Sequence, residues 1–357
     1  MALSIGIVGL ANVGKSTLFN ALTDANALIA NYPFATIEPN TGVVPVPDER
    51  LAKLAEIYKT EKIVPASVTF VDIAGLVEGA SKGEGLGNQF LSHIRSTNAI
   101  CHVVRAFSDE DVTRSGSTNP KSDIEIINTE LALADLQTVN NRLPKLEKEA
   151  RANPKLKPLY DALARIKDAL EAGTPVHKFS DIDPEHIQDL FLITAKPVIY
   201  VFNVDEKDLG DDSKKKELAD LVKPANALFV SAKLESELRG LDDADRQELL
   251  ESYGQKDSGL VQLIHAAYDT LGLQSFLTAG EKEVRAWTIK NGATAPEAAG
   301  AIHSDFERGF IAAQVVDYND LIGAGSLLAA RAAGKVRTEG KTYIVQPNDV
   351  IEFRFNV

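Results

Sequence analysis

The segment Gly9-Leu10-Ala11-Asn12-Val13-Gly14-Lys15-Ser16 is the part of the sequence that is most informative about the fold. It has the G-x-x-x-x-G-K-S pattern of a phosphate-binding loop, and it follows the apolar run Ile5-Gly6-Ile7-Val8. After the loop, Leu18, Phe19 and Leu22 have helical spacing and predict a helix with one apolar face. A glycine-rich turn without function is the alternative, but it would not require a strand before it and a helix after it. The order of strand, loop and helix therefore predicts a P-loop nucleotide-binding fold.

The residue types of this loop suit phosphate binding. Gly9 and Gly14 allow tight turns that point backbone N–H groups at phosphates, and the helix N-terminus adds partial positive charge. We expect Lys15 to contact the β and γ phosphates and the Ser16 hydroxyl to bind Mg²⁺. The predicted nucleotide-binding residues of this segment are Asn12, Val13, Gly14, Lys15, Ser16 and Thr17.

Two further segments are predicted to respond to the γ phosphate. The apolar run Val68-Thr69-Phe70-Val71 leads into a D-x-x-G sequence, in which Asp72 would hold Mg²⁺ through water and the Gly75 N–H would meet the γ phosphate. Thr36 lies in a polar, proline-containing segment before it and is a second candidate hydroxyl ligand. The predicted metal ligands are Ser16, Thr36 and Asp72, and the predicted catalytic residues are Lys15 and Gly75.

The segment Asn203-Val204-Asp205-Glu206 occupies the place of the N-K-x-D motif that recognises guanine in GTPases. The aspartate of that motif accepts two hydrogen bonds from guanine, and the extra methylene of Glu206 displaces its carboxylate by roughly 1.5 Å. Hydrogen bonds to charged groups contribute about 1.5–3 kcal/mol each, so the displacement favours ATP over GTP. A small shift of Glu206 that restores guanine recognition is the alternative.

Other residues complete the predicted base site. Val204 replaces the lysine that covers the base and would leave an apolar contact, and Asn203 could bond the adenine amine and N7. After the apolar run Ala227-Leu228-Phe229-Val230, the sequence Ser231-Ala232-Lys233 resembles the loop behind the base. The predicted base-site residues are Asn203, Val204, Glu206, Ser231, Ala232 and Lys233.

Taken together, these motifs resemble the Obg-like ATPase (YchF) family, a branch of the Ras-like translation-factor class of P-loop proteins. The most specific segments are residues 79–91, which run from a glycine-rich stretch into a helix, and residues 36–43. Residues 280–357 are similar to the family's TGS domain, a small ubiquitin-like β-grasp module. The resemblance implies a preference for ATP and an association with ribosomes.

The group that orients the attacking water is open. Leu76 stands where Ras-like enzymes have a glutamine, and a leucine cannot orient water, so hydrolysis must be slow or use another group. The family often has a histidine in the loop after Arg105-Ala106-Phe107, but this chain has Arg114 there. Arg114 could neutralise charge in the transition state, or it could be a solvated loop residue.

The pattern along the chain predicts an α/β fold in four ranges. Residues 1–120 and 196–275 alternate strands with helices and predict one mostly parallel, Ras-like sheet. Residues 121–195 have apolar residues at three-four spacing on both sides of Pro154 and predict an inserted antiparallel helical hairpin. Residues 280–357 predict the β-grasp module, with one helix from Pro296 to Asp305.

Composition limits the class of protein. The 357 residues include 44% hydrophobic and 25% charged residues, as in ordinary globular proteins, with no apolar run long enough for a membrane span. No secretory signal is apparent, and the single Cys101 excludes an intrachain disulfide, so we expect a cytoplasmic protein. Core packing is the expected role of Cys101, and redox sensing is the alternative.

Charge limits the partners. A net charge of −13 disfavours nonspecific nucleic-acid binding, so we expect no DNA partner. Two local basic clusters could nevertheless dock on the ribosome or structured RNA, with solvated charge as the alternative. The hairpin-tip cluster is Lys145, Lys148, Arg151, Lys155 and Lys157, and the C-terminal cluster is Arg331, Lys335, Arg337 and Lys341.

Three functions are compatible with these patterns. The first is a slow ATPase switch with Mg²⁺ as cofactor, in which Asn12 could also help to bind K⁺ near the phosphates. The second is a GTPase of the same fold. The third is a nucleotide-gated binding module whose hydrolysis is incidental.

Overall fold

The computed structural model describes residues 3–27, 41–73, 86–108, 119–179, 182–183 and 186–356. The chain forms two compact units, each with residues from two stretches of sequence. Unit 1 consists of Met1–Val43 and Thr69–Leu263, and unit 2 consists of Val44–Val68 and Ile264–Val357.

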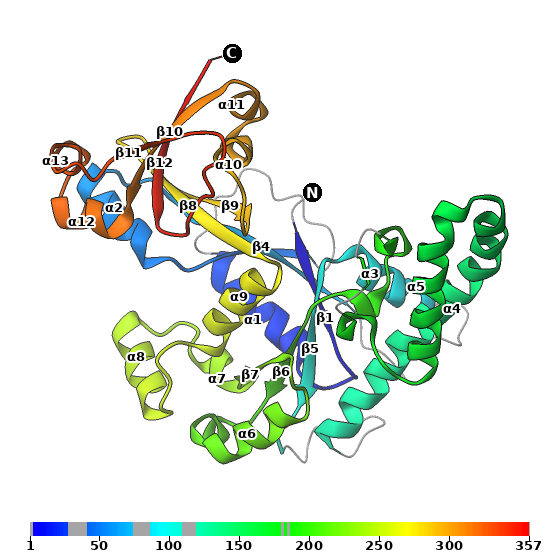
Figure 1. Ribbon diagram of the computed structural model, residues 1–357. Helices are drawn as coiled ribbons and strands as arrows, with labels where there is room; N and C mark the ends of the chain where they lie inside the picture. The colour runs from blue at the N-terminus through cyan, green and yellow to red at the C-terminus, as the bar shows by residue number, and fades with distance from the viewer. Residues whose placement is uncertain are drawn as a thin grey trace. The chain divides into compact units, whose positions relative to one another are not determined.

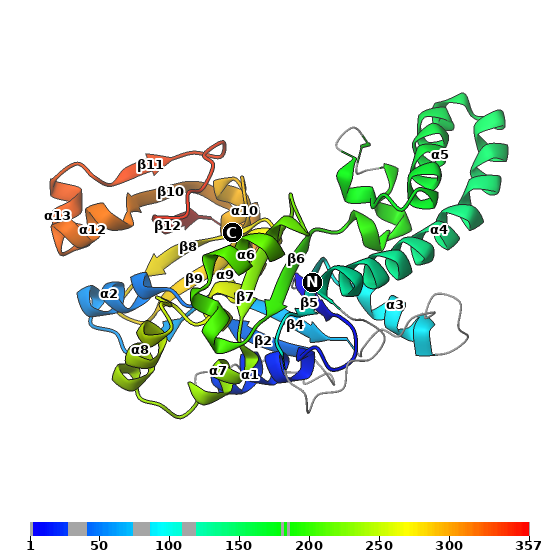
Figure 2. The same ribbon diagram turned by 90° about the horizontal axis from the view of Figure 1, so that it is seen from below.

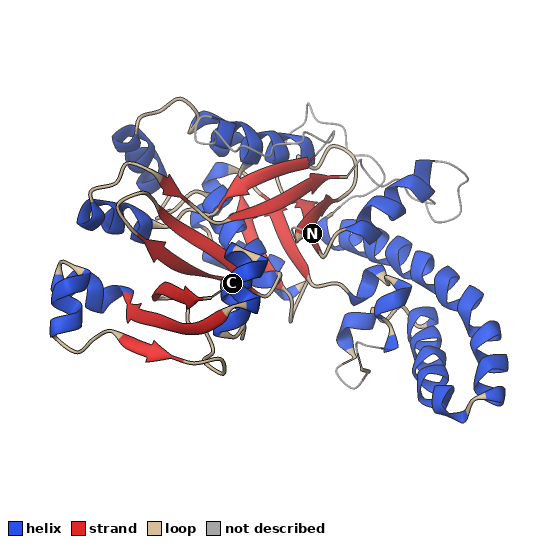
Figure 3. Ribbon diagram, turned by 90° about the horizontal axis from the view of Figure 1, so that it is seen from above, coloured by secondary structure: helices blue, strands red, loops and turns tan. Residues whose placement is uncertain are grey.

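The first sheet has six strands in the order β2-β4-β1-β5-β6-β7. Figure 3 draws the strands of the chain in red and its helices in blue. The strands of the first sheet are β1 (Ser4–Val8), β2 (Thr41–Pro45), β4 (Ser67–Asp72), β5 (Ala99–Arg105), β6 (Val198–Asn203) and β7 (Asn226–Val230). Strands β4, β1, β5, β6 and β7, which follow one another in the sheet, are parallel to one another. Every residue of the central strand β5 is buried, as expected for a parallel sheet covered on both faces. The predicted α/β fold with a mostly parallel sheet is confirmed.

Helices pack on both sides of this sheet (Figure 1). They are α1 (Lys15–Ala27), α3 (Leu86–Ser96), α6 (Asp212–Asp220), α7 (Ala232–Glu237), α8 (Asp243–Ser252) and α9 (Gly259–Thr270). Because the strands are parallel, the carboxyl ends of β1, β4, β6 and β7 lie at one edge of the sheet. The residues that follow these four strands are those with the predicted nucleotide motifs.

The predicted helical hairpin is confirmed. Helix α4 (Pro120–Ala152) and helix α5 (Lys157–Glu171) run side by side and are joined by the short 3₁₀ helix η1 (Pro154–Leu156) (Figure 2). The Asn153 side chain accepts a hydrogen bond from Lys155 N, which stabilises the turn. The facing apolar stripes form one buried cluster, which includes Val139, Leu146, Leu163, Ile166 and Leu170.

The regular helices of the insertion end earlier than predicted. Between Glu171 and β6 the only helices among the described residues are the short 3₁₀ helices η2 (Val176–Lys178), η4 (Gln188–Leu190) and η5 (Ile193–Ala195). Asp135, a fully buried residue of α4, accepts hydrogen bonds from Ile193 N at 2.8 Å and Thr194 N at 2.7 Å. This carboxylate attaches the segment before β6 to the hairpin.

Unit 2 contains the second sheet, with the strand order β11-β10-β12-β8-β9-β3. Its strands are β3 (Ile63–Val64), β8 (Leu273–Ala279), β9 (Val284–Lys290), β10 (Phe310–Asp317), β11 (Arg337–Glu339) and β12 (Asp349–Phe355), and its helices are α2 (Glu49–Tyr58), α10 (Ala295–Ile302), α11 (Ser304–Arg308), α12 (Tyr318–Ala324) and α13 (Leu327–Ala332). One face packs against α10 in a core that includes Phe276, Ala299 and Val315. This order of the five C-terminal strands is that of a β-grasp.

Three details of unit 2 differ from the sequence prediction. Residues 264–275 were assigned to the nucleotide-binding part but belong to this unit, whose strand β8 begins at Leu273. Residues 44–68, assigned to the nucleotide-binding part, belong to this unit because β3 extends the sheet beside β9 and Arg50 of α2 donates hydrogen bonds to Pro347 O and the Asn348 side chain. The single helix predicted from Pro296 to Asp305 is two helices, because His303 is extended and its side chain accepts a hydrogen bond from Asp305 N.

Within the described ranges, none of the helices is both long enough and apolar enough to cross a membrane.

Candidate nucleotide-binding site

The phosphate-binding loop connects β1 to α1 in a conformation that depends on its residue types. Asn12 has a φ of 61°, in the left-handed region that asparagine tolerates better than most residues. Gly14 has a φ of 97°, and a Cβ atom there would lie 2.4 Å from Asn203 Nδ2. Glycine is therefore required at position 14 for both its backbone angle and its contact.

Lys15 is held inside the loop. Its side chain is buried, and Nζ donates a hydrogen bond to Leu10 O at 2.6 Å. Burial lowers the pKa of Lys15 to about 8, and the charge of Asp72 opposes this shift. The ammonium is thus positioned among the backbone groups of the loop, where it can compensate phosphate charge.

Ser16 and Asp72 lie together beside Lys15. Ser16 Oγ is 3.4 Å from Asp72 Oδ2, at the end of β4. Burial raises the pKa of Asp72, and Lys15 and Ser16 act in the opposite direction. Asp72 Oδ1 is buried without a hydrogen-bond partner among the residues that the structure describes. An unsatisfied carboxylate oxygen next to a hydroxyl is a donor set that fits Mg²⁺.

The other two predicted residues of this cluster, Thr36 and Gly75, lie outside the described residues, as do Leu76 and Arg114. In the parts of the chain that are described, no group of three or more His, Cys, Asp or Glu side chains is arranged to hold a metal ion. The fit to Mg²⁺ therefore rests on Ser16 and Asp72.

Asn203 connects the phosphate loop to the base loop. Its Nδ2 donates to Val13 O at 3.0 Å, and its Oδ1 accepts from Ala232 N at 3.0 Å. The sequence predicted a direct contact of Asn203 with adenine and missed this structural role. One N–H and one lone pair of the amide are left for a base, because both groups have a second hydrogen-bonding position.

Glu206 is paired with Lys233. Their charged groups are 2.8 Å apart, and the Glu206 side chain is 17% exposed. Burial tends to raise the pKa of Glu206, but the hydrogen bond and charge of Lys233 outweigh it and the pKa is lowered. The Glu206 carboxylate is therefore ionised and forms an ion pair with the Lys233 ammonium, so it is not available to a base alone.

Val204 packs in the protein core, and its predicted apolar contact with the base stays a prediction. Its side chain is 3% exposed and packs in an apolar cluster with Phe202, Leu209 and Leu234. Because the cluster covers it, Val204 supports the base loop from within the core and offers little surface to a ligand.

The base loop is built on the N-terminus of α7. Ser231 Oγ accepts a hydrogen bond from Leu234 N at 3.3 Å and so caps this helix. Nearby, Ser108 N donates to Asp205 Oδ2 at 3.1 Å, which fixes the chain after β5 beside the base motif. A cavity of about 340 Å³ opens here, lined by Ser108, Asp205, Glu206, Lys207, Lys233, Glu237 and Tyr253.

Comparison with known proteins identifies the family. Residues 4–144 match a family model described as "50S ribosome-binding GTPase", and residues 273–356 match the model of a YchF GTPase C-terminal domain, described as "Protein of unknown function (DUF933)". "Ribosome-binding ATPase YchF" of Bacillus subtilis is 52% identical, and the alignment covers 100% of both chains. The chain belongs to the YchF family.

Other YchF proteins agree with this assignment. The YchF of Escherichia coli O157:H7 is 48% identical, again over 100% of both chains. The solved "Structure of the Schizosaccharomyces pombe YchF GTPase" has a TM-score of 0.87 and 39% identity, and covers 99% of this chain and 97% of that one. The resemblance stated from the motifs is confirmed. The bacterial YchF relatives are named ATPases and the yeast YchF structure is titled a GTPase, so the names differ on the base.

Arg105 and His102 were not assigned from the sequence to the site of this YchF protein, and Cys101 had two alternative predicted roles. Arg105 is buried at the end of β5, and its guanidinium lies 4.4 Å from the centre of the Phe107 ring. His102 is buried, and burial together with the charge of Lys15 lowers its pKa to about 3, so it is neutral. Burial raises the pKa of the Cys101 thiol to about 12, which agrees with core packing and an unreactive thiol.

Proposed function

We propose that this YchF chain binds and hydrolyses ATP slowly and acts as a nucleotide-dependent switch on the ribosome in the cytoplasm. The strongest support for this proposal is the link between the phosphate-binding loop and the base-binding loop. Asn203 bonds both the phosphate loop and the base loop, and the base loop carries a glutamate paired with Lys233. The name of the Bacillus subtilis relative supports the same activity and partner.

The proposed mechanism uses this chain's own groups. The Lys15 ammonium would bind the β and γ phosphates and stabilise the charge that develops on them. Ser16 and Asp72 would hold Mg²⁺, which supplies positive charge at the phosphate oxygens when it is bound. We propose that Asn12 helps to place K⁺ near the phosphates, in which case turnover would be faster in K⁺ than in Na⁺ at equal ionic strength.

Selectivity for the base is the first test of the proposal. We expect ATP to bind at least about tenfold more tightly than GTP, a difference of about 1.4 kcal/mol. Glu206→Asp should reduce this ratio, because the shorter side chain moves the carboxylate toward the position that accepts from guanine. Val204→Lys, which the sequence suggests as a companion change, is unsuitable because it would bury an ammonium in the core.

Equilibrium binding of fluorescent ATP and GTP analogues, with competition by the unlabelled nucleotides, measures the ratio. Glu217→Asp, an exposed glutamate of α6 outside this cavity, is the matched control and should leave the ratio unchanged. Tighter binding of GTP than of ATP by the unmodified chain would contradict the ATPase proposal and favour a GTPase of the same fold.

The charge pairing of the two basic clusters indicates which one would dock on ribosomal RNA. In the C-terminal cluster, Lys335 is 3.1 Å from Asp320, and Arg337 lies 3.7 Å from both Glu339 and Asp349. These pairs neutralise two of the four cations of that cluster.

The hairpin-tip cluster retains more unpaired charge. Arg151 pairs with Glu147 and Lys157 with Asp161. Three exposed lysines, Lys145, Lys148 and Lys155, form no ion pair among the described residues. We therefore propose the hairpin tip as the main ribosome contact.

Reversing the charges of the hairpin tip should weaken ribosome association. The triple change Lys145→Glu, Lys148→Glu and Lys155→Glu is expected to lower cosedimentation with 70S ribosomes and to reduce its salt dependence by about two to three in log–log slope. The matched control reverses Arg331, Lys335 and Lys341, whose effect should be smaller. Undiminished cosedimentation of the hairpin triple variant, in ATP and in ADP, would refute the hairpin contact.

A further inference from the structure

Strand β12 lies inside the sheet of unit 2, but one of its two sides is only partly paired with a neighbouring strand. Strand β12 pairs with β10 along its whole length, from Phe310 with Phe355 to Asp317 with Asp349. On its other side, the register of β12 with β8 covers the single pair Val350 with Leu277. Strand β8 ends two residues later, at Ala279, which lies at the level of Glu352, so β12 from Phe353 to Phe355 has no strand beside it on that side among the described residues. Such an edge can accept another strand.

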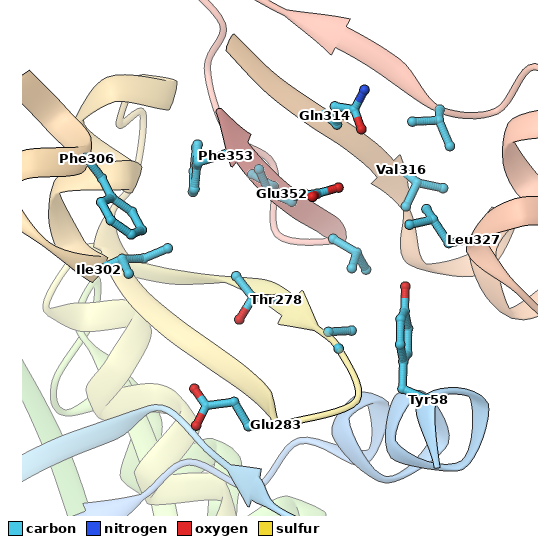
Figure 4. A pocket seen from close by; sticks show the side chains of 15 residues that line it. Tyr58, Thr278, Glu283, Ile302, Phe306, Gln314, Val316, Leu327, Glu352 and Phe353 are labelled. Carbon is cyan, nitrogen blue, oxygen red and sulfur yellow. The ribbon is translucent and has the colours of Figure 1, made fainter. Parts of the chain in front are cut away.

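A cavity of about 330 Å³ lies along this open edge. Figure 4 shows it between the end of β8 and β12, with Ile302 and Phe306 at one end and Leu327 and Val316 at the other. Most of its wall is apolar and only partly covered: Ile302, Phe306, Leu327, Val336 and Phe353 are half-buried. The cavity therefore offers apolar surface directly beside unused backbone hydrogen-bonding groups.

The charged groups that line the cavity are acidic. Glu283 and Glu352 line it, and no lysine or arginine does. Glu283 is already paired with Lys62 at 2.6 Å and with Arg285 at 3.6 Å. Glu352 is exposed and forms no ion pair within the described residues, and its charge contributes to raising the pKa of Tyr58, after burial. In Figure 4 the Tyr58 hydroxyl is turned toward the space beside Glu352.

We propose that this cavity binds an extended peptide segment of a partner protein, with a lysine or arginine between small apolar residues. The peptide backbone would add to the free edge of β12, as in recognition by β-strand addition. Its apolar side chains would fill the half-buried wall, and its cation would pair with Glu352. Charge complementarity favours a peptide over RNA here, because a carboxylate without a partner repels phosphate.

Three fluorescein-labelled peptides test the proposal on the full-length chain. Each has the extended sequence Thr-Val-X-Val-Thr, with X as arginine, glutamine or glutamate, and anisotropy measures binding at low salt. The arginine peptide should bind at least about fivefold more tightly than the glutamate peptide. Glu352→Lys should reverse this order, and methylation of the backbone nitrogens of the arginine peptide should weaken its binding. Glu307→Gln, an exposed glutamate outside the cavity, is the matched control.

Three results of these experiments would overturn the proposal. Absence of binding of all three peptides up to about 1 mM overturns the proposal. It is also overturned if Glu352→Lys leaves the order of the peptides unchanged, or if the N-methylated arginine peptide binds as well as its parent. Because Glu352 is exposed, its replacement should not alter the thermal unfolding of the chain, and an unchanged melting curve excludes misfolding as the cause of an effect.

Discussion

Lys15→Ala is expected to abolish ATP hydrolysis, with turnover at least about 100-fold below that of the unmodified chain. Lys15 is buried in the loop and donates to Leu10 O at 2.6 Å, so alanine removes a positive charge that is already positioned for the phosphates. Phosphate release under single-turnover conditions, with and without 70S ribosomes, measures the loss. Lys216→Ala, an exposed lysine on α6, is the control. Turnover of Lys15→Ala close to that of this control would contradict the assigned role.

The pH dependence of binding tests the same residue independently. The pKa of Lys15 is lowered from 10.5 to about 8, so the free protein loses this proton as the pH rises through 8. Phosphates favour the charged form, so the Kd for ATP should rise above pH 8, by up to about tenfold per pH unit. The free energy of unfolding should rise between pH 8 and 10.5, because the unfolded chain binds more protons there. The Lys15→Ala variant should show neither trend.

Asn203→Ala is expected to weaken ATP and GTP together, by roughly tenfold or more, without changing their ratio. The change leaves Val13 O and Ala232 N without the partner they have at 3.0 Å, and a buried group left unsatisfied costs about 1–3 kcal/mol. The phosphate and base loops would then no longer be connected. Competition binding with both nucleotides measures the two affinities.

Two variants support the interpretation of Asn203. Asn226→Ala, at the exposed start of β7, is the matched control and should bind both nucleotides normally. Gly14→Ala should have the same effect as Asn203→Ala, because its Cβ would lie 2.4 Å from Asn203 Nδ2. If Asn203→Ala weakens ATP alone, Asn203 acts by contact with adenine and its structural role is minor.

Much of the fold could be predicted from local patterns. The loop of residues 9–16 requires a strand before it and a helix after it, and both are present as β1 and α1. The apolar stripes around Pro154 determine two facing helices, and α4 and α5 bury them. These predictions succeeded because spacing along a strand or helix determines which side chains share a face.

The membership of residues 44–68 could not be predicted in this way. This segment lies between two nucleotide motifs in the sequence, and for that reason it was predicted to belong to the nucleotide-binding part. It belongs to unit 2 because β3 pairs with β9 and Arg50 bonds to Pro347 O, 297 residues away. No spacing rule relates positions so far apart.

For the candidate site, the chemical groups could be predicted from short motifs: the lysine and hydroxyl of the phosphate loop, the aspartate at the end of β4, and a glutamate where guanine-specific proteins have an aspartate. Each follows from residue type and position within a short motif. The contacts of these groups could not be predicted, because they depend on how the chain folds in three dimensions. Asn203 bonds Val13 across 190 residues, Val204 is enclosed by the core, and Lys233 occupies the carboxylate of Glu206. A hydrogen bond depends on the distance between two atoms, and for residues in different loops that distance exists only after the sheet has brought the strand ends together.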